Sequence, residues 1–225
     1  MIELPTMSAK DRKCLREPFC SISHMVGAGL SIVGLIVLIF VSWGRPWHLV
    51  AFSLYGISLI LLYTASAIYH SLNVSEKNKH RLAKFDHVAI FILIAGTYTP
   101  VCLLTLRGVW GWSMLAIELG LATVGIVATL IAKKPTDVLR VIIYLLMGWL
   151  AVIAISPLRD KLSSPALIWL FTGGITYSVG TVIFAMDKPH LWPGKFSAHD
   201  LWHLFVLGGS ACHYVLMFFF IARTA

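Results

Sequence analysis

Long apolar runs alternate with short polar connections along nearly the whole chain. Seven runs can be marked, at about residues 21–42, 49–70, 85–106, 112–132, 138–155, 165–186 and 198–222. Each is close to the ~20 residues that an α-helix needs to cross the hydrocarbon core of a bilayer. The pattern predicts an all-α membrane protein, with a polar leader over residues 1–20 and one domain, residues 21–222, formed by a bundle of seven transmembrane helices.

The connections are predicted to be loops, and the third run contains a bend. Residues 71–84 form a basic loop in this interpretation, and residues 157–164 link the fifth run to the sixth. The sequence Gly-Thr-Tyr-Thr-Pro at 96–100 is expected to bend the third helix, because proline cannot donate a backbone hydrogen bond there.

Composition supports a membrane protein and changes what the charge means. The chain of 225 residues is 58% hydrophobic and 12% charged, against roughly a quarter charged in a soluble domain. A formal net charge of +8 would suggest nucleic acid in a soluble protein. Here the lysines and arginines lie in the short connections, so we expect contacts with anionic lipid headgroups and none with nucleic acid.

The distribution of lysine and arginine predicts the orientation. Thirteen of them fall in the leader and in the connections on the same side as the leader, and five fall on the other side. Cytoplasmic loops carry the excess of positive charge, so the N-terminus is expected in the cytoplasm and the C-terminus outside.

The four cysteines show no metal-binding spacing. Cys14 and Cys20 precede the first run, and Cys102 and Cys212 lie within runs, with no C-x-x-C pattern. The spacing indicates neither a disulfide framework nor a cysteine zinc site, and Cys102 and Cys212 are interpreted as packing residues.

Polar residues converge at one depth of the predicted bundle. His199 and His203 stand four apart at the start of the seventh run, so both imidazoles lie on one helical face. His70 and Ser66 lie near the end of the second run, and Asp86 opens the third. All five are therefore expected within two turns of the cytoplasmic membrane surface, where ionisable groups usually face a cavity or one another.

Three neutral imidazoles suit zinc, and three protein ligands with a vacant fourth position are typical of a catalytic site. The alternative is that these histidines cap helix ends at the interface and never meet. His24, at the start of the first run, is a rival ligand, although capping is the simpler interpretation. His213 lies about 15 Å beyond His203 along a helix, so it is expected to form a buried hydrogen bond between helices instead. Glu118, inside the fourth run, has no predicted role.

Four stretches of the chain resemble the haemolysin III family. They are TASAIYH (64–70), FDHVAIFILIAGTYTP (85–100), AHDLWHLFVLGGSACHY (198–214) and EPFCSISHMVGAG (17–29). This family is the bacterial branch of the progestin and adipoQ receptor family and is related to the alkaline ceramidases. The resemblance implies a multi-pass protein of the bacterial inner membrane. It also implies that His70, His199 and His203 are zinc ligands, and that Ser66 and Asp86 are a polar pair associated with metal-dependent hydrolysis of lipid amides.

Three functions remain open from the sequence. The first is a zinc-dependent intramembrane hydrolase of acyl lipids, amide or ester. In it, Asp86 would orient the zinc-bound water or take its proton, and Ser66 would help stabilise the developing oxyanion or support the residues around the metal. The second is a receptor or regulatory protein in which zinc only ties helices together. The third is a pore-forming haemolysin, which needs oligomers or a continuous polar path that the apolar outer halves of the runs do not suggest. The oligomeric state is left open.

Overall fold

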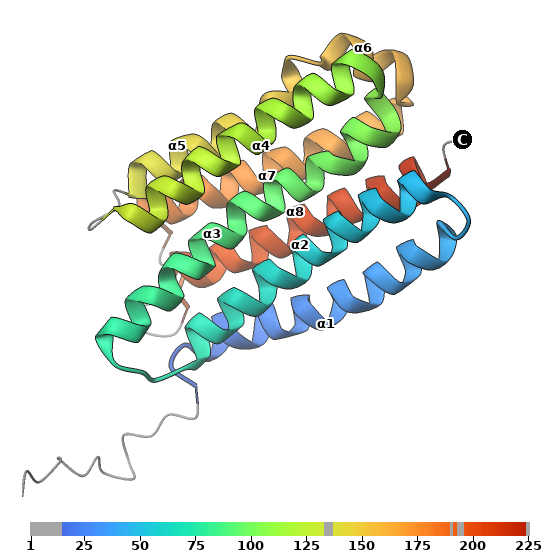
Figure 1. Cartoon of the computed structure of the whole chain (residues 1–225). Coiled ribbons are helices and arrows are strands. Elements are labelled where there is room, and N and C mark those ends of the chain that lie inside the picture. Colours follow the sequence, from blue (N-terminus) through green and yellow to red (C-terminus); the bar gives the residue numbers. More distant parts are fainter. Residues whose placement is uncertain (1–14, 133–136, 190, 193–195, 224–225) are drawn as a thin grey trace, which may run out of the picture.

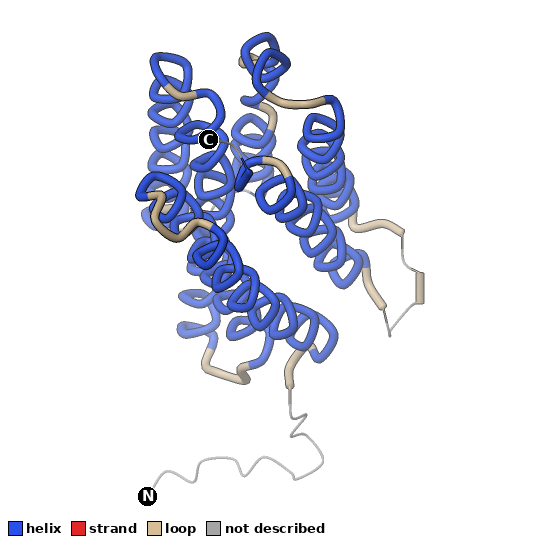
Figure 2. Tube along the Cα trace, turned by 90° about the vertical axis from the view of Figure 1, so that its right-hand side faces the viewer, coloured by secondary structure: helices blue, strands red, loops and turns tan. Residues whose placement is uncertain are grey.

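The protein is a bundle of helices joined by short loops (Figures 1 and 2). The computed structural model describes residues 15–132, 137–189, 191–192 and 196–223. The elements are α1 (Pro18–Val41), α2 (Pro46–Ser71), α3 (Glu76–Pro100), η2 (Val101–Leu106), α4 (Gly108–Ile131), α5 (Asp137–Gly148), η3 (Leu150–Val152), α6 (Ile155–Lys161), α7 (Ser164–Met186), α8 (Ala198–Phe219) and η4 (Ile221–Arg223). Residues 1–14 of the predicted leader, with Cys14, lie outside the described residues, as do Lys133, Lys134 and Lys195.

The predicted spans are found as helices. In the described chain, six helical segments are long and apolar enough to cross a membrane, and α5 with α6 makes a seventh if the bent pair counts as one span. The protein is therefore a multi-pass helical membrane protein. Because α1 begins and α8 ends at opposite ends of the bundle, an odd number of crossings fits the chain path (Figure 1). Which end faces the cytoplasm stays a prediction from the charge count.

The predicted loop at residues 71–84 is wrong over most of its length. The helix α3 begins at Glu76, about two turns before the apolar run. It ends at Pro100, and the π-helical segment η2 begins at the next residue. Ser75 precedes the helix and Glu76 lies in its first turn, where a negative charge is favoured. Lysine, arginine and leucine are good helix formers, so this polar stretch extends α3 out of the apolar layer.

The predicted fifth helix, residues 138–155, is broken. The helix α5 ends at Gly148, and the axis bends by 52° before α6. The hydroxyl of Tyr98 sits in the break, where it donates to the Gly148 carbonyl (3.1 Å) and accepts from the Ala151 amide (2.8 Å). A side chain inserted into the backbone ladder is a common cause of a helix kink. Pro157, which cannot donate, lies in the first turn of α6.

Close helix contacts hold the bundle together at small residues. A Cβ on Gly173 would lie 2.5 Å from Nε2 of His213, and one on Gly209 would lie 2.7 Å from the Tyr177 ring. These glycines let α7 and α8 approach closely, as expected for helices that pack inside a membrane. Ser210 on α8 joins Tyr63 on α2 and Tyr177 on α7 through hydrogen bonds of 2.7 Å each. The helix that carries His199 and His203 is thereby fixed against both neighbours.

Candidate metal centre

The three histidines predicted from the sequence meet at one end of the bundle. His70 lies in the last turn of α2, and His199 and His203 lie in the first two turns of α8. The Nε2 atom of His199 is 3.5 Å from Nε2 of His70 and 3.2 Å from Nε2 of His203. His70 and His203 are almost fully buried, and His199 is partly exposed. Three imidazole edges that face a common point in this way form a group that could hold a metal ion.

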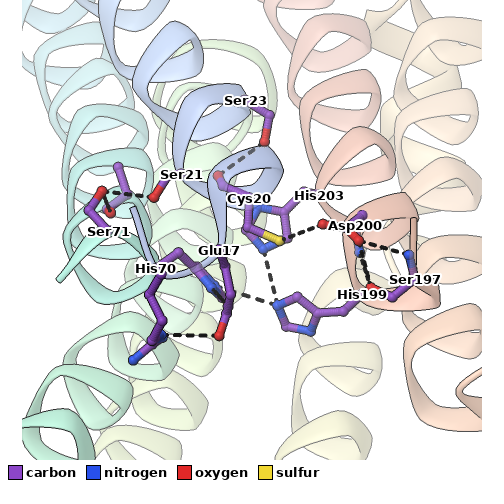
Figure 3. A network of polar contacts seen from close by, with 12 residues as sticks. Glu17, Cys20, Ser21, Ser23, His70, Ser71, Ser197, His199, Asp200 and His203 are labelled. Carbon is purple, nitrogen blue, oxygen red and sulfur yellow. Dashed lines mark hydrogen bonds and ion pairs between the residues drawn. The ribbon is translucent and has the colours of Figure 1, made fainter. Parts of the chain in front are cut away.

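Glu17 fixes the orientation of His70. The start of α1 packs beside the end of α2, where the Glu17 amide donates to the His70 carbonyl (3.1 Å). The Nδ1 atom of His70 pairs with Oε2 of Glu17, which leaves Nε2 turned toward His199 (Figure 3). This hydrogen bond lowers the pKa of the Glu17 carboxyl against the opposing effect of its partial burial. A carboxylate behind a ligand histidine is a recurrent feature of metal sites.

Cys20 also belongs to this cluster, which corrects the conclusion drawn from cysteine spacing. Its sulfur and one ring nitrogen from each of the three histidines all lie within 4.8 Å of one another. Cys20 is 2% exposed, in the first turn of α1. Spacing along the chain identifies paired cysteines, whereas helix packing brings this single cysteine to histidines far away in the chain. Glu17, Cys20 and His24, spaced by three and four, form a polar helical face that could have revealed it.

The first turn of α8 contains Asp200, which hydrogen-bonds the thiol of Cys20. Asp200 Oδ2 accepts hydrogen bonds from the amide (2.8 Å) and hydroxyl (2.7 Å) of Ser197, which completes a capping box. The other oxygen, Oδ1, accepts from the sulfur of Cys20 at 3.1 Å. The same carboxylate therefore caps the start of α8 and positions the thiol, a role that no sequence pattern indicated.

Asp86 and Ser66 lie beside the cluster and outside the group of close ligand atoms. Ser66 is 2% exposed on α2, and Asp86 lies at the start of the apolar part of α3. Both line a cavity that also reaches His199 and His203. The predicted convergence of five polar residues from three helices is therefore present in the fold.

The cavity extends from the cluster into the bundle. Its empty volume is about 1240 Å³, including the part that is open to the surroundings. Side chains from α3, α5, α7 and α8 form most of its wall, and most of that wall is apolar. At the far end the wall contains Tyr98, Trp149 and His213. The polar cluster is therefore joined to a mainly apolar space.

The remaining candidates have other positions. His24 is buried on α1 and packs against the ring of His203, with centroids 3.9 Å apart, and it is not part of the close ligand group. His213 lies near the Leu170 carbonyl of α7 at 3.3 Å, in the interhelical hydrogen bond that its position predicted. Glu118 is fully buried in α4, and neither carboxyl oxygen has a hydrogen-bond partner within the described part of the chain.

The fold and the cluster define a class: an integral, multi-pass helical membrane protein with a His/Cys cluster that could bind a metal ion. Residues 12–214 match the model of the family described as "Haemolysin-III related". The chain belongs to this family.

The relatives support that assignment over most of the chain. It is 40% identical to the "Hemolysin-3 homolog" of Bacillus subtilis over 205 residues, which cover 90% of this chain and 93% of the relative. It is 42% identical to "Hemolysin-3" of Bacillus cereus over 207 residues, 91% of each chain. A more distant relative is the human "Monocyte to macrophage differentiation factor", 25% identical over 182 residues, with coverages of 79% and 73%.

Proposed function

We propose that this protein is a zinc-dependent intramembrane hydrolase of acyl lipids, with an amide or ester as the bond that is cleaved. The observation that carries the proposal is the meeting of three facing imidazoles with a Ser66–Asp86 pair at the end of a mostly apolar cavity. The polar groups supply reactive chemistry, and the cavity can accept a hydrocarbon chain. With the predicted orientation, the site lies near the cytoplasmic surface.

The donor set and its spacing fit zinc. Tetrahedral coordination with Zn–N bonds of 2.0–2.1 Å places neighbouring ligand nitrogens about 3.3–3.4 Å apart. The Nε2 separations of 3.2 and 3.5 Å at His199 bracket that value. His70, His199 and His203 would hold the ion, and Glu17 would keep the Nε2 atom of His70 free to bind it. Bound zinc supplies a Lewis acid and lowers the pKa of a coordinated water to about 7.

Residues of the cavity wall would supply the proton acceptor, the oxyanion contact and the binding surface for the acyl chain. An Asp86 carboxylate oxygen would orient the attacking water and take its proton, since it faces the cavity beside the cluster. The Ser66 hydroxyl, which lines the same cavity, would either donate to the developing oxyanion or hold the Asp86 side chain in place. The apolar walls from α3, α5 and α7 would hold the acyl chain and exclude water, and the lipid would enter sideways from the bilayer.

Substitution of Asp86 tests the proposal. Asp86→Asn removes the proton acceptor and leaves the histidines in place. Hydrolysis of a ceramide-like substrate should therefore fall by about 10²–10⁴-fold while zinc content stays near one ion per chain. Ser66→Ala should cause a smaller loss. Zinc content, thermal stability and hydrolysis are measured on the same preparations. Asp160→Asn, an exposed aspartate on α6, serves as the control and should change none of the three.

Two results would contradict the proposal that this protein is a hydrolase. One is the absence of hydrolysis by the wild-type protein over a broad panel of acyl lipids. The other is full hydrolysis by Asp86→Asn.

A second candidate is a receptor-like or regulatory membrane protein with a structural metal. The position of Cys20 favours it, because four protein donors are typical of structural zinc sites. In that case the wild-type protein has no hydrolytic activity, and Asp86→Asn and Ser66→Ala can change only the thermal stability of the protein. A pore is less well supported, because the wall of the cavity is mainly apolar.

A further inference from the structure

Cys20 is a donor that a three-histidine site does not use. Its sulfur lies within 4.8 Å of a ring nitrogen of each of the three histidines, and only 2% of the residue is exposed. A free cysteine buried in apolar surroundings usually packs against other side chains and has no polar partner. This one is directed at a cluster of imidazoles, and sulfur is among the ligands that zinc prefers.

The surrounding structure holds the sulfur at that place. Asp200 accepts the thiol hydrogen bond with Oδ1, and its other oxygen is committed to the capping box at Ser197 (Figure 3). The capping box fixes Asp200 at the start of α8, one residue after His199. Cys20 of α1 is therefore tied to the same helical turn that carries a histidine of the cluster.

The position of Cys20 relative to the cavity is also informative. His199, His203 and Asp86 line the cavity, whereas Cys20 is not among its lining residues. A ligand bond from Cys20 would thus come from the α1 side of the cluster, and the cavity wall would remain as it is.

We propose that Cys20 is a fourth protein ligand of the metal, so that the resting centre has three histidines and one thiolate. The inference rests on the metal site of the proposed function, and it does not depend on hydrolysis. The sulfur binds as a thiolate. Metal binding releases the thiol proton to the solvent, and the S–H hydrogen bond to Asp200 is then lost. The same hydrogen bond gives the thiol a defined position when it leaves the metal.

The ligand bond can be measured directly in the purified full-length protein. With zinc bound, X-ray absorption at the zinc edge should show one sulfur at about 2.3 Å in addition to nitrogens at about 2.0–2.1 Å. With Co²⁺ in place of zinc, a near-ultraviolet thiolate-to-cobalt charge-transfer band should appear. Cys20→Ser should abolish the sulfur signal and the band, and Cys212→Ser, on the later part of α8, should keep both.

A second variant protects the test against misfolding of Cys20→Ser. Replacing Cys14, Cys102 and Cys212 together by serine leaves Cys20 as the single thiol, and the sulfur signal should persist in that protein. A stoichiometric metal with nitrogen and oxygen neighbours only would overturn the role of Cys20 and leave the hydrolase standing. A zinc–sulfur bond in a protein without hydrolysis would support Cys20 and contradict the hydrolase. A wild-type protein that binds neither metal would overturn both.

Discussion

The contact between Glu17 and His70 predicts that a residue outside the ligand set controls metal affinity. The Oε2 atom of Glu17 pairs with Nδ1 of His70, and Oε1 accepts a hydrogen bond from Nε of Arg16 (3.1 Å). The Glu17 side chain is 44% exposed, so solvent screens its charge and the ion pair adds little to the stability of the fold. Its main effect is on the direction in which the imidazole of His70 points.

The size of the effect follows from that role. Loss of a carboxylate that orients a ligand histidine typically weakens metal binding by about 10–100-fold, or about 1.4–2.8 kcal/mol. In Glu17→Gln the amide oxygen can still accept from Nδ1, so we expect a loss near tenfold. In Glu17→Ala no acceptor remains on the side chain, and the loss should approach 100-fold.

The assay is zinc competition against a chromophoric chelator with purified protein, together with thermal unfolding. Glu76→Gln is the matched control, because Glu76 is also a glutamate next to a helix start, with a side chain 90% exposed and only a 3.8 Å contact with Lys79. The control should bind zinc as the wild type does. A dissociation constant for Glu17→Ala within about twofold of the wild type would refute the reasoning, because orientation effects of this kind are at least tenfold.

Further predictions concern the ligands, the packing and the topology. The His203→Ala variant should lose most of its zinc, because a ligand is removed, whereas His24→Ala should retain its zinc. Elemental analysis of both variants measures this, and zinc loss from His24→Ala alone would make His24 the ligand in place of His203. Gly125→Ala should destabilise the detergent-solubilised protein by about 1–3 kcal/mol, because its Cβ would lie 2.2 Å from the Phe91 ring. Gly120→Ala on the same helix meets nothing within 4 Å and should leave stability unchanged or raise it by up to about 1 kcal/mol, because alanine is the better helix former; equal losses in thermal unfolding would contradict the packing argument. A reporter fused after Ala225 should be active only outside the cytoplasm, and a cytoplasmic signal there would reverse the predicted orientation.

The sequence by itself determined the spans and the polar layer. Apolar length identifies a membrane helix because the bilayer fixes how many residues are needed, and this requirement is local in the chain. The spacing of His199 and His203 likewise follows from the helical repeat, and counting turns placed His70, Ser66 and Asp86 at the same depth. The polar start of α3 and the break after Gly148 escaped the same reasoning. Apolar length says nothing of a helix that continues into water. The end of α5 at Gly148 is hydrogen-bonded by a tyrosine fifty residues away in the chain, a contact that no local pattern specifies.

Only the tertiary structure decided which residues join the histidine cluster. Cys20 lies in the first turn of α1 and Glu17 directly precedes that helix, and nothing in their spacing relative to α2 or α8 specifies a contact. Their positions come from the packing of the start of α1 against the end of α2 and the capped start of α8. The cavity has the same origin, because it is bounded by side chains of helices that are far apart in sequence. Periodicity gives the face and the depth of a residue, whereas its neighbours across the bundle are set by how the helices pack together.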